Sequence, residues 1–383
     1  MNLLFISEDH SVANGGVTTV VSQLADELVL RCPDLRLRIV ATGNDAVHQH
    51  ARVSVELVKP TRVGKFWRWS PALQKKIDNI LEAEDIDVIH IHGIWTAVQW
   101  MGLLKASKRK IPHILSAHGM LEPWFWGGSA SAFKRFKKML YLRNVFFPVV
   151  SRDAIIHAIT PLEQKNLQRM FPHQEVIAIP NAIAMNEKDE NSPFLHSGES
   201  FKNIVYLGRI HPKKGIDLLI RAFHRVSFGM QWQLIIAGQE ESPSYLHSLQ
   251  QLISELELTS QVHFTGPVYG GQKWDLLRKA WVMVAPSYSE VMGMVNLEAA
   301  KCHTPSITTW ETGLLDWESG GGISVHPNVE ELARALHATS RWTPTERTER
   351  GEKSYQFVKQ KYSWDAVFPL WEKLYKEMAL VRE

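Results

Sequence analysis

The sequence contains little that could cross-link the chain or carry it through a membrane. Only two cysteines occur among 383 residues, Cys32 and Cys302, far apart and outside any CxxC pair. This scarcity excludes a disulfide scaffold and a structural zinc site made of cysteines. No apolar run approaches the roughly 18 residues that a membrane-spanning helix requires. The first residues also lack the basic segment of a signal peptide, so we expect a cytoplasmic protein.

An excess of charge of one sign is also missing. Lysine and arginine number 43, aspartate and glutamate 40, and the formal net charge is only +3. A balance of this kind does not indicate a nucleic-acid-binding protein. No GxGxxG motif follows an expected strand, which argues against a nicotinamide or flavin oxidoreductase. The chain does contain 45% hydrophobic residues, enough for two packed domains at this length.

Short continuous apolar runs alternate with helical periodicity in the first half of the chain. Such runs are typical of strands buried on both faces of a parallel sheet. We expect strands at Leu3–Ile6, Leu37–Ala41, Val88–Ile91 and His113–Ser116, with helices at Val17–Leu30, Pro71–Glu82 and Ala97–Lys108. This βαβα order predicts a doubly wound α/β domain.

The same pattern restarts after a polar stretch, Asn186–Ser200, which we interpret as an interdomain linker. Expected strands are Ile204–Leu207, Leu234–Ala237, Val262–Phe264, Trp281–Ala285 and Ser306–Thr308, and helices fit at Gly215–Val226, Tyr245–Glu257, Gln272–Lys279 and Gly293–Lys301. We therefore predict two Rossmann-like domains facing each other across a cleft. The first comprises residues 1–185 with a returning helix at 364–383, and the second comprises residues 200–363.

The second domain contains the residues with the most evident chemistry. A strand ends at Gly208, and the turn after it carries Arg209 and Lys214. Because open α/β sheets bind ligands at the carboxyl ends of their strands, these cations suit phosphate oxygens. A plain solvated basic loop is the alternative interpretation. Another strand ends at Gly238, where a glycine either lets a ligand approach the backbone or simply makes a turn.

A third segment places Glu290 in a loop and Glu298 inside the helix that follows. Carboxylates accept hydrogen bonds from sugar and ribose hydroxyls, so this pair suits a carbohydrate ligand. The first amides of the helix, at Gly293–Val295, are expected to be free to bind an anion. A helix N-cap with a surface glutamate is the alternative.

The two glutamates, separated by seven residues, resemble the E-x7-E motif of retaining GT-B glycosyltransferases, and the chain resembles glycosyltransferase family 4. The resemblance spans nearly the whole sequence, since its segments follow one another in the family's order. These segments are Gly15-Gly16-Val17, His90-Ile91-His92-Gly93, Ser116-Ala117-His118-Gly119-Met120, Pro180-Asn181, Gly208-Arg209 with Lys214, the glutamate pair, and Ser363-Trp364. Four residues depart from the family's pattern: Val291, Met292, His303 and Ala182.

The resemblance implies a role for each matching position. Arg209 and Lys214 would bind the donor's pyrophosphate, Glu298 the ribose and Glu290 a sugar hydroxyl. The implied donor site comprises Gly16, Gly208, Arg209, Lys214, Gly238, Glu290, Gly293, Met294, Val295 and Glu298, and the implied acceptor side comprises Gly15, Gly16, His92, Trp95 and His118. The residues implied to be catalytic are His118, Glu290, Arg209 and Lys214. The implied reaction uses no metal and no cofactor besides the nucleoside-diphosphate sugar, and the expected partners include no nucleic acid.

Two further signals suggest metal sites that we do not favour. Asp85-Ile86-Asp87 spells DxD, but it precedes a strand and would lie at the wrong edge of the sheet, so we interpret it as a turn. His90 and His92 share one strand face and could form half of a metal site with His118. A metal centre needs further ligands of fixed geometry, and no nearby carboxylate is evident.

Cations interleave with aromatic residues at two places, Trp124–Lys138 and Lys65–Trp69. This composition suits an anionic lipid surface, although the aromatic residues could equally line a core or an acceptor pocket. We expect a saccharide acceptor, lipid-linked in cell-surface polysaccharide or lipopolysaccharide synthesis, and peripheral membrane contact. The alternatives are a silent sugar-nucleotide-binding subunit of an assembly complex, a nucleotide-sugar epimerase or a phosphorylase of this fold.

Overall fold

The computed structural model describes residues 1–10, 16–43, 51–59, 61, 67–122, 132–185 and 201–381. The chain forms two compact units: unit 1 comprises Met1–Pro180 and Val367–Glu383, and unit 2 comprises Asn181–Ala366. The sequence had suggested divisions at residues 185, 200 and 364. The expected linker, Asn186–Ser200, lies outside the described residues.

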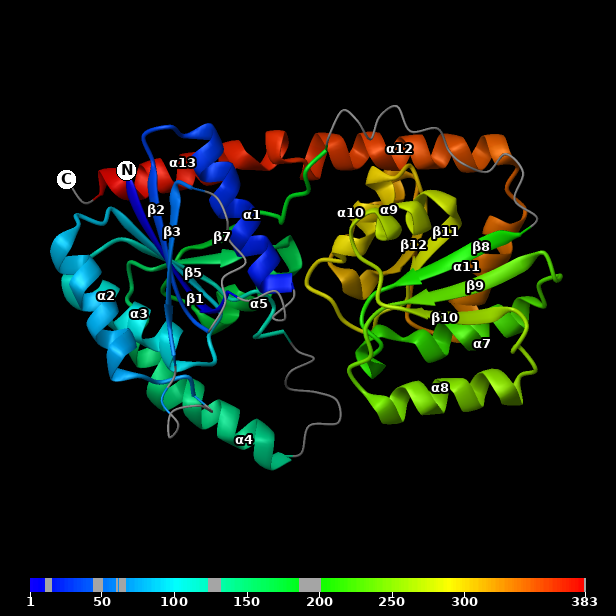
Figure 1. Ribbon diagram of the computed structural model, residues 1–383, viewed down its shortest axis with the longest axis horizontal. Coiled ribbons are helices and arrows are strands. Elements are labelled where there is room, and N and C mark those ends of the chain that lie inside the picture. The colour runs from blue at the N-terminus through cyan, green and yellow to red at the C-terminus, as the bar shows by residue number, and fades with distance from the viewer. Residues whose placement is uncertain are drawn as a thin grey trace. The chain divides into compact units, whose positions relative to one another are not determined.

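Unit 1 is built on a seven-stranded parallel sheet in the order β3-β2-β1-β4-β5-β6-β7 (Figure 1). Its strands are β1 (Asn2–Asp9), β2 (Arg36–Thr42), β3 (Val53–Val58), β4 (Val88–His92), β5 (His113–Ser116), β6 (Ile155–Ala158) and β7 (Val176–Ala178). Its helices are α1 (Gly16–Arg31), α2 (Pro71–Ala83), α3 (Ala97–Arg109), α4 (Ala132–Tyr141), α5 (Pro161–Met170) and α13 (Trp364–Leu380).

Unit 2 contains a six-stranded parallel sheet in the order β10-β9-β8-β11-β12-β13. Its strands are β8 (Lys202–Leu207), β9 (Trp232–Ala237), β10 (Val262–Gly266), β11 (Ala280–Ala285), β12 (Ser306–Thr309) and β13 (Ile323–Val325). Its helices are α7 (Ile216–Val226), α8 (Pro243–Glu255), α9 (Gly270–Lys279), α10 (Met294–Lys301), α11 (Val329–Ser340) and α12 (Pro344–Tyr362).

The prediction of two parallel, Rossmann-like α/β folds is confirmed. Every residue of β11 is buried, and so are Leu3–Ser7 of β1, which is why these strands read as unbroken apolar runs. Asp87 accepts a hydrogen bond from the Asn2 backbone at 2.7 Å. The DxD sequence is therefore a helix-to-strand turn at the amino edge of the sheet, as expected.

A chain of buried polar side chains ties α13 to the middle of the unit 1 sheet. Tyr375 Oη lies 2.7 Å from His90 Nδ1, His90 Nε2 lies 2.7 Å from Ser116 Oγ, and Ser116 Oγ lies 2.7 Å from His157 Nδ1. His157 Nε2 ends the chain, 2.8 Å from the carbonyl oxygen of Ile179. These four side chains are all at most 2% exposed.

The terminal carbonyl fixes the direction of every bond in this chain. A carbonyl oxygen only accepts, so His157 carries its hydrogen on Nε2 and accepts at Nδ1. Ser116 therefore donates to His157, His90 donates from Nε2 to Ser116, and Tyr375 donates to His90. Each histidine is neutral because burial lowers its pKa, to about 4 for His157 and well below 6.5 for His90.

This chain predicts that the protein loses stability in mild acid. Below pH 6.5 the histidines of the unfolded chain bind protons while the buried, depressed-pKa histidines do not, so lowering the pH favours unfolding. Each such histidine lowers the free energy of unfolding by about 1.4 kcal/mol for each pH unit below 6.5. Urea unfolding between pH 7 and pH 4.5 should show that His157→Gln has a shallower pH slope than the native chain by about this amount.

His173→Gln is the matched control, because the His173 side chain is exposed. Its pH slope should match that of the native chain. Equal slopes for His157→Gln and the native chain would show that His157 is not held neutral by burial.

Candidate functional site

The turn after β8 and the loop after β11 meet in unit 2 and bring Lys214 and Glu290 into an ion pair. Gly215 has a left-handed backbone with φ of 65°, and a Cβ there would lie 2.1 Å from the carbonyl oxygen of Pro286. The Tyr288 amide also donates to the Lys213 carbonyl at 2.9 Å. The expected proximity of these two charged residues is therefore a consequence of close backbone contact.

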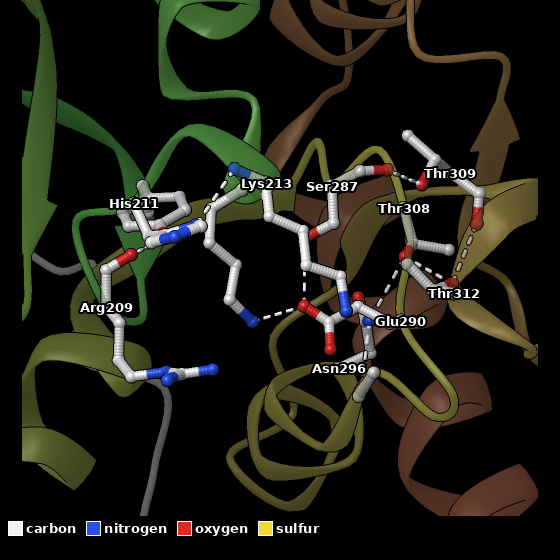
Figure 2. A network of polar contacts seen from close by, with 12 residues as sticks. Arg209, His211, Lys213, Ser287, Glu290, Asn296, Thr308, Thr309 and Thr312 are labelled. Atoms are coloured by element: carbon white, nitrogen blue, oxygen red, sulfur yellow. Dashed lines mark hydrogen bonds and ion pairs between the residues drawn. The ribbon is translucent and has the colours of Figure 1, made fainter. Parts of the chain in front are cut away.

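A set of buried hydroxyl groups holds the loop that carries Glu290. Figure 2 shows Thr308, Thr309 and Thr312 beside this loop. Thr309 Oγ1 donates to the Ser287 carbonyl at 2.6 Å, and Ser287 Oγ donates to Glu290 Oε1 at 3.3 Å. The Glu290 amide donates to the Glu311 carbonyl at 2.7 Å. The carboxylate is thus oriented by both its backbone and its side chain.

More backbone amides at the start of α10 have hydrogen-bond acceptors than the sequence suggested. The Gly293 amide donates to the Thr312 carbonyl at 3.0 Å, and the Met294 amide donates to the Met292 carbonyl at 2.9 Å. The expectation that all three amides of Gly293–Val295 are free was therefore wrong for two of them. The turn after β12 accepts from Gly293, and the loop itself accepts from Met294. In the described part of the chain, only the Val295 amide of the three lacks an acceptor.

Glu298 has a lysine partner that sequence reasoning missed. Lys273, on α9, lies 2.8 Å from Glu298 Oε1, and both side chains are about one quarter exposed. Each glutamate of the motif is therefore paired with a lysine. Lys273 lies 25 residues before Glu298 in the sequence, so no local spacing could have identified it.

Arg209 lies at the same edge of the sheet but has a different partner. Its Nη1 atom is 2.8 Å from Glu241 Oε1, and its side chain is 62% exposed. In Figure 2 the guanidinium extends toward the side on which Glu290 lies. Gly208 and Gly238 adjoin each other, since a Cβ on Gly238 would lie 1.7 Å from the Gly208 carbonyl oxygen. Close packing of the two turns therefore explains the glycine at position 238.

In unit 1, His118 lies just beyond the carboxyl end of β5 in a left-handed conformation with φ of 50°. It is half-buried, and its Nε2 atom is 3.0 Å from Nδ1 of His92, the last residue of β4. Burial and the nearby His157 lower the pKa of His118 to about 3. The ring is therefore neutral at ordinary pH.

Glu163, which sequence reasoning also missed, holds the turn at His118. It is only 2% exposed, and its two oxygens accept hydrogen bonds from the backbone amides of Gly119 at 2.8 Å and Ile159 at 2.7 Å. Burial raises its pKa to about 7, although these amides act in the opposite direction. Its position near the start of α5 reads as an ordinary helix cap, so the sequence gave no sign of this longer-range contact.

The remaining predicted positions of unit 1 are more dispersed. Trp95 is half-buried, and its ring centroid lies 5.8 Å from the ring centroid of Tyr141. The Lys138 ammonium lies 5.3 Å from the Trp95 ring centroid. Gly16 begins α1, and nothing lies within 4 Å of a Cβ built on it. Gly15 lies outside the described residues.

A metal site that included His90 would have to use nitrogens that already have partners. Both nitrogens of His90 are engaged, with Tyr375 and Ser116. Within the described ranges, no group of three or more histidine, cysteine, aspartate or glutamate residues is arranged to hold a metal ion.

Two family models match the chain and adjoin at residue 187. Glycosyltransferase Family 4 matches residues 14–187, and Glycosyl transferases group 1 matches residues 187–353. The chain is 26% identical to an uncharacterized glycosyltransferase of Methanocaldococcus jannaschii over 92% of each chain. It is 27% identical to alpha-maltose-1-phosphate synthase of Mycobacterium tuberculosis over 72% of this chain and 75% of that one.

Solved structures show the same fold. Sucrose-phosphate synthase from Thermosynechococcus elongatus aligns with a TM-score of 0.75 at 18% identity over 99% of both chains. Anabaena HepE, solved with UDP and glucose, aligns with a TM-score of 0.74 at 18% identity over 98% of this chain and 99% of that one. Together with the two family models, these similarities identify the protein as a GT-B enzyme that belongs to the group 1 glycosyltransferases of family 4.

Proposed function

We propose that the enzyme transfers a sugar from a nucleoside-diphosphate sugar to a saccharide hydroxyl, with retention of anomeric configuration and without a metal ion. The observation that carries this proposal is the meeting of Lys214 and Glu290 at the carboxyl edge of the unit 2 sheet, with Arg209 on the same turn as Lys214. Two cations suit a diphosphate, and a carboxylate suits a sugar hydroxyl.

Lys214 has a partner that the donor must replace. In the structure its ammonium contacts Glu290, and both side chains are 19% exposed. A diphosphate carries more negative charge than one carboxylate, so it should take the ammonium and release Glu290 to a sugar hydroxyl. Charge that develops on the departing nucleoside diphosphate is then stabilised by Lys214 and Arg209.

Glu298 and the start of α10 complete the proposed donor site. Glu298 accepts hydrogen bonds from ribose hydroxyls, and Lys273 orients the carboxylate. The Val295 amide can donate to a phosphate or sugar oxygen, where the helix terminus adds about 0.3–1 kcal/mol. Crystal structures of HepE contain UDP or UDP-glucose, which supports a uridine nucleotide as the first donor to test.

Unit 1 supplies the acceptor side in this proposal. His118 contacts the reacting sugar. Trp95 follows β4 as His118 follows the neighbouring strand β5, so it offers an aromatic face at the same edge of the sheet. Neutral His118 binds oxygen atoms by hydrogen bonding without adding charge. Glu163 holds the backbone beside His118 through the Gly119 amide, and His92 holds the His118 ring through its Nε2 atom.

The acceptor is proposed to be a lipid-linked saccharide in cell-surface polysaccharide or lipopolysaccharide synthesis, reached from the cytoplasmic face of the membrane. Helix α4 supports this membrane contact, because Phe133, Phe136 and Met139 are each more than half exposed. The Lys137 ammonium lies 4.4 Å from the Phe133 ring centroid, so cations border this apolar surface. Such a surface suits anionic lipid headgroups. None of the helices in the described ranges is both long and apolar enough to cross a membrane.

Nucleotide binding tests the proposed function. One nucleoside diphosphate, among UDP, GDP, ADP and dTDP, should raise the melting temperature equally in magnesium and in EDTA. At a hundred times the dissociation constant, binding adds about 2.7 kcal/mol to stability. Lys214→Ala should lose the shift because it removes a phosphate ligand. Glu290→Gln should keep or increase it, because the competing carboxylate is gone, yet should abolish sugar transfer.

Arg225→Ala is the matched control for loss of one positive charge, since Arg225 lies at the far end of α7 and is 58% exposed. Its shift should equal that of the native chain. If no nucleoside diphosphate stabilises the protein, or if Lys214→Ala retains the full shift, the assignment of the donor site is wrong.

Flotation with anionic vesicles tests the membrane contact. The native protein should float with vesicles of phosphatidylglycerol at low salt and less at high salt, because the attraction is partly electrostatic. Phe133→Asp should remain in the bottom fraction, without the vesicles. Met230→Asp, which replaces an equally exposed apolar side chain in unit 2, should float like the native protein. Equal flotation of both variants would remove α4 from the membrane contact.

A further inference from the structure

The hydrogen bond between His92 and His118 determines which nitrogen of His118 carries its hydrogen. Both rings are neutral. His92 is 1% exposed between Phe5 and His90, whose ring centroids lie 5.1 Å and 4.0 Å from its own, and burial lowers its pKa well below 6.5. Burial lowers the pKa of His118 to about 3. Each ring therefore carries a single N–H group.

One hydrogen must lie between the two rings, because His92 Nδ1 and His118 Nε2 are 3.0 Å apart. In the first arrangement, His92 donates from Nδ1, its Nε2 is a bare lone pair, and His118 carries its hydrogen on Nδ1. In the second arrangement, His118 donates from Nε2, its Nδ1 is a bare lone pair, and His92 carries its hydrogen on Nε2.

The surroundings of His92 Nε2 favour the first arrangement. This atom is buried and no group of the described chain bonds to it. An N–H group buried without an acceptor loses its hydrogen bond to water outright, and orphaned donors are rarer in proteins than orphaned acceptors. The second arrangement would leave His92 with such an N–H group, whereas the first leaves only a lone pair without a donor.

We propose that His92 is a positioning residue that holds His118 in the tautomer with its hydrogen on Nδ1, so that His118 presents a hydrogen-bond donor to an oxygen of the substrate. His118 is half-buried, and its Nδ1 atom bonds to no described group, so this donor remains available. A phosphate oxygen and a sugar hydroxyl both accept such a bond. The use of the donor rests on the proposed function, but the tautomer does not.

The arrangement also limits what His118 can do. With Nδ1 protonated and Nε2 occupied by His92, the ring has no free lone pair with which to remove a proton. His118 therefore binds and orients an oxygen, and the proton of the attacking hydroxyl must leave by another route. Neighbouring bonds reinforce the geometry, since Gln99 Nε2 donates to the His92 carbonyl at 3.0 Å.

Nitrogen NMR of the histidine-labelled protein tests the tautomer without any ligand. The His118 signals are assigned by their loss in His118→Gln. In the native protein we expect a protonated Nδ1 and a bare Nε2. In His92→Asp, whose carboxylate only accepts, His118 Nε2 should become protonated, whereas His92→Asn, whose side-chain amide can donate from nearly the same point, should keep the hydrogen on Nδ1. Sugar transfer should be lost in His92→Asp and recovered in His92→Asn.

His113→Phe is the matched control, because His113 is a buried histidine of β5 that makes its hydrogen bonds to Ile111 and Ser151. It should leave the His118 tautomer unchanged. A native His118 protonated on Nε2, or a His118 Nε2 that stays bare in His92→Asp, would overturn the proposal. The expected tautomers without any nucleotide binding would instead support the role of His92 and contradict the proposed function.

Discussion

The close approach of Gly215 to the Pro286 carbonyl is the constraint on which the candidate donor site depends. Any Cβ at position 215 would lie 2.1 Å from that oxygen, so only glycine lets the turn after β8 reach the loop after β11. Gly238 and Gly208 make a similar contact between neighbouring turns. These contacts bring together Lys214 and Glu290, which lie 76 residues apart in the chain.

The two glutamates of the motif are balanced in charge by lysines. Both glutamates of the motif are paired with lysines, Lys214 with Glu290 and Lys273 with Glu298, so no carboxylate of the motif is left without a cation. Partly exposed ion pairs of this kind contribute little net stability, on the order of 0–1 kcal/mol. A phosphate can therefore exchange with Glu290 at small cost. The pair keeps the loop ordered before the donor arrives.

The fold and half of the site could be predicted from the sequence, because strands buried on both faces leave continuous apolar runs and charged residues follow their carboxyl ends. The short or edge strands β3, β6, β7 and β13 were not expected, since they contain few residues with a clear pattern. Lys273 and Glu163 were missed because their partners are distant in sequence. The His92–His118 bond depends on ring orientation, which no sequence pattern encodes.

The central claim is that the Lys214–Glu290 pair opens to receive a diphosphate. A crystal structure of the complex with the nucleoside diphosphate that binds most tightly tests it most directly. The account predicts phosphate oxygens within hydrogen-bonding distance of Lys214 Nζ and the Arg209 guanidinium, ribose hydroxyls on Glu298, and Glu290 separated from Lys214. A nucleotide bound elsewhere, or one bound here with the Lys214–Glu290 contact intact, would contradict it.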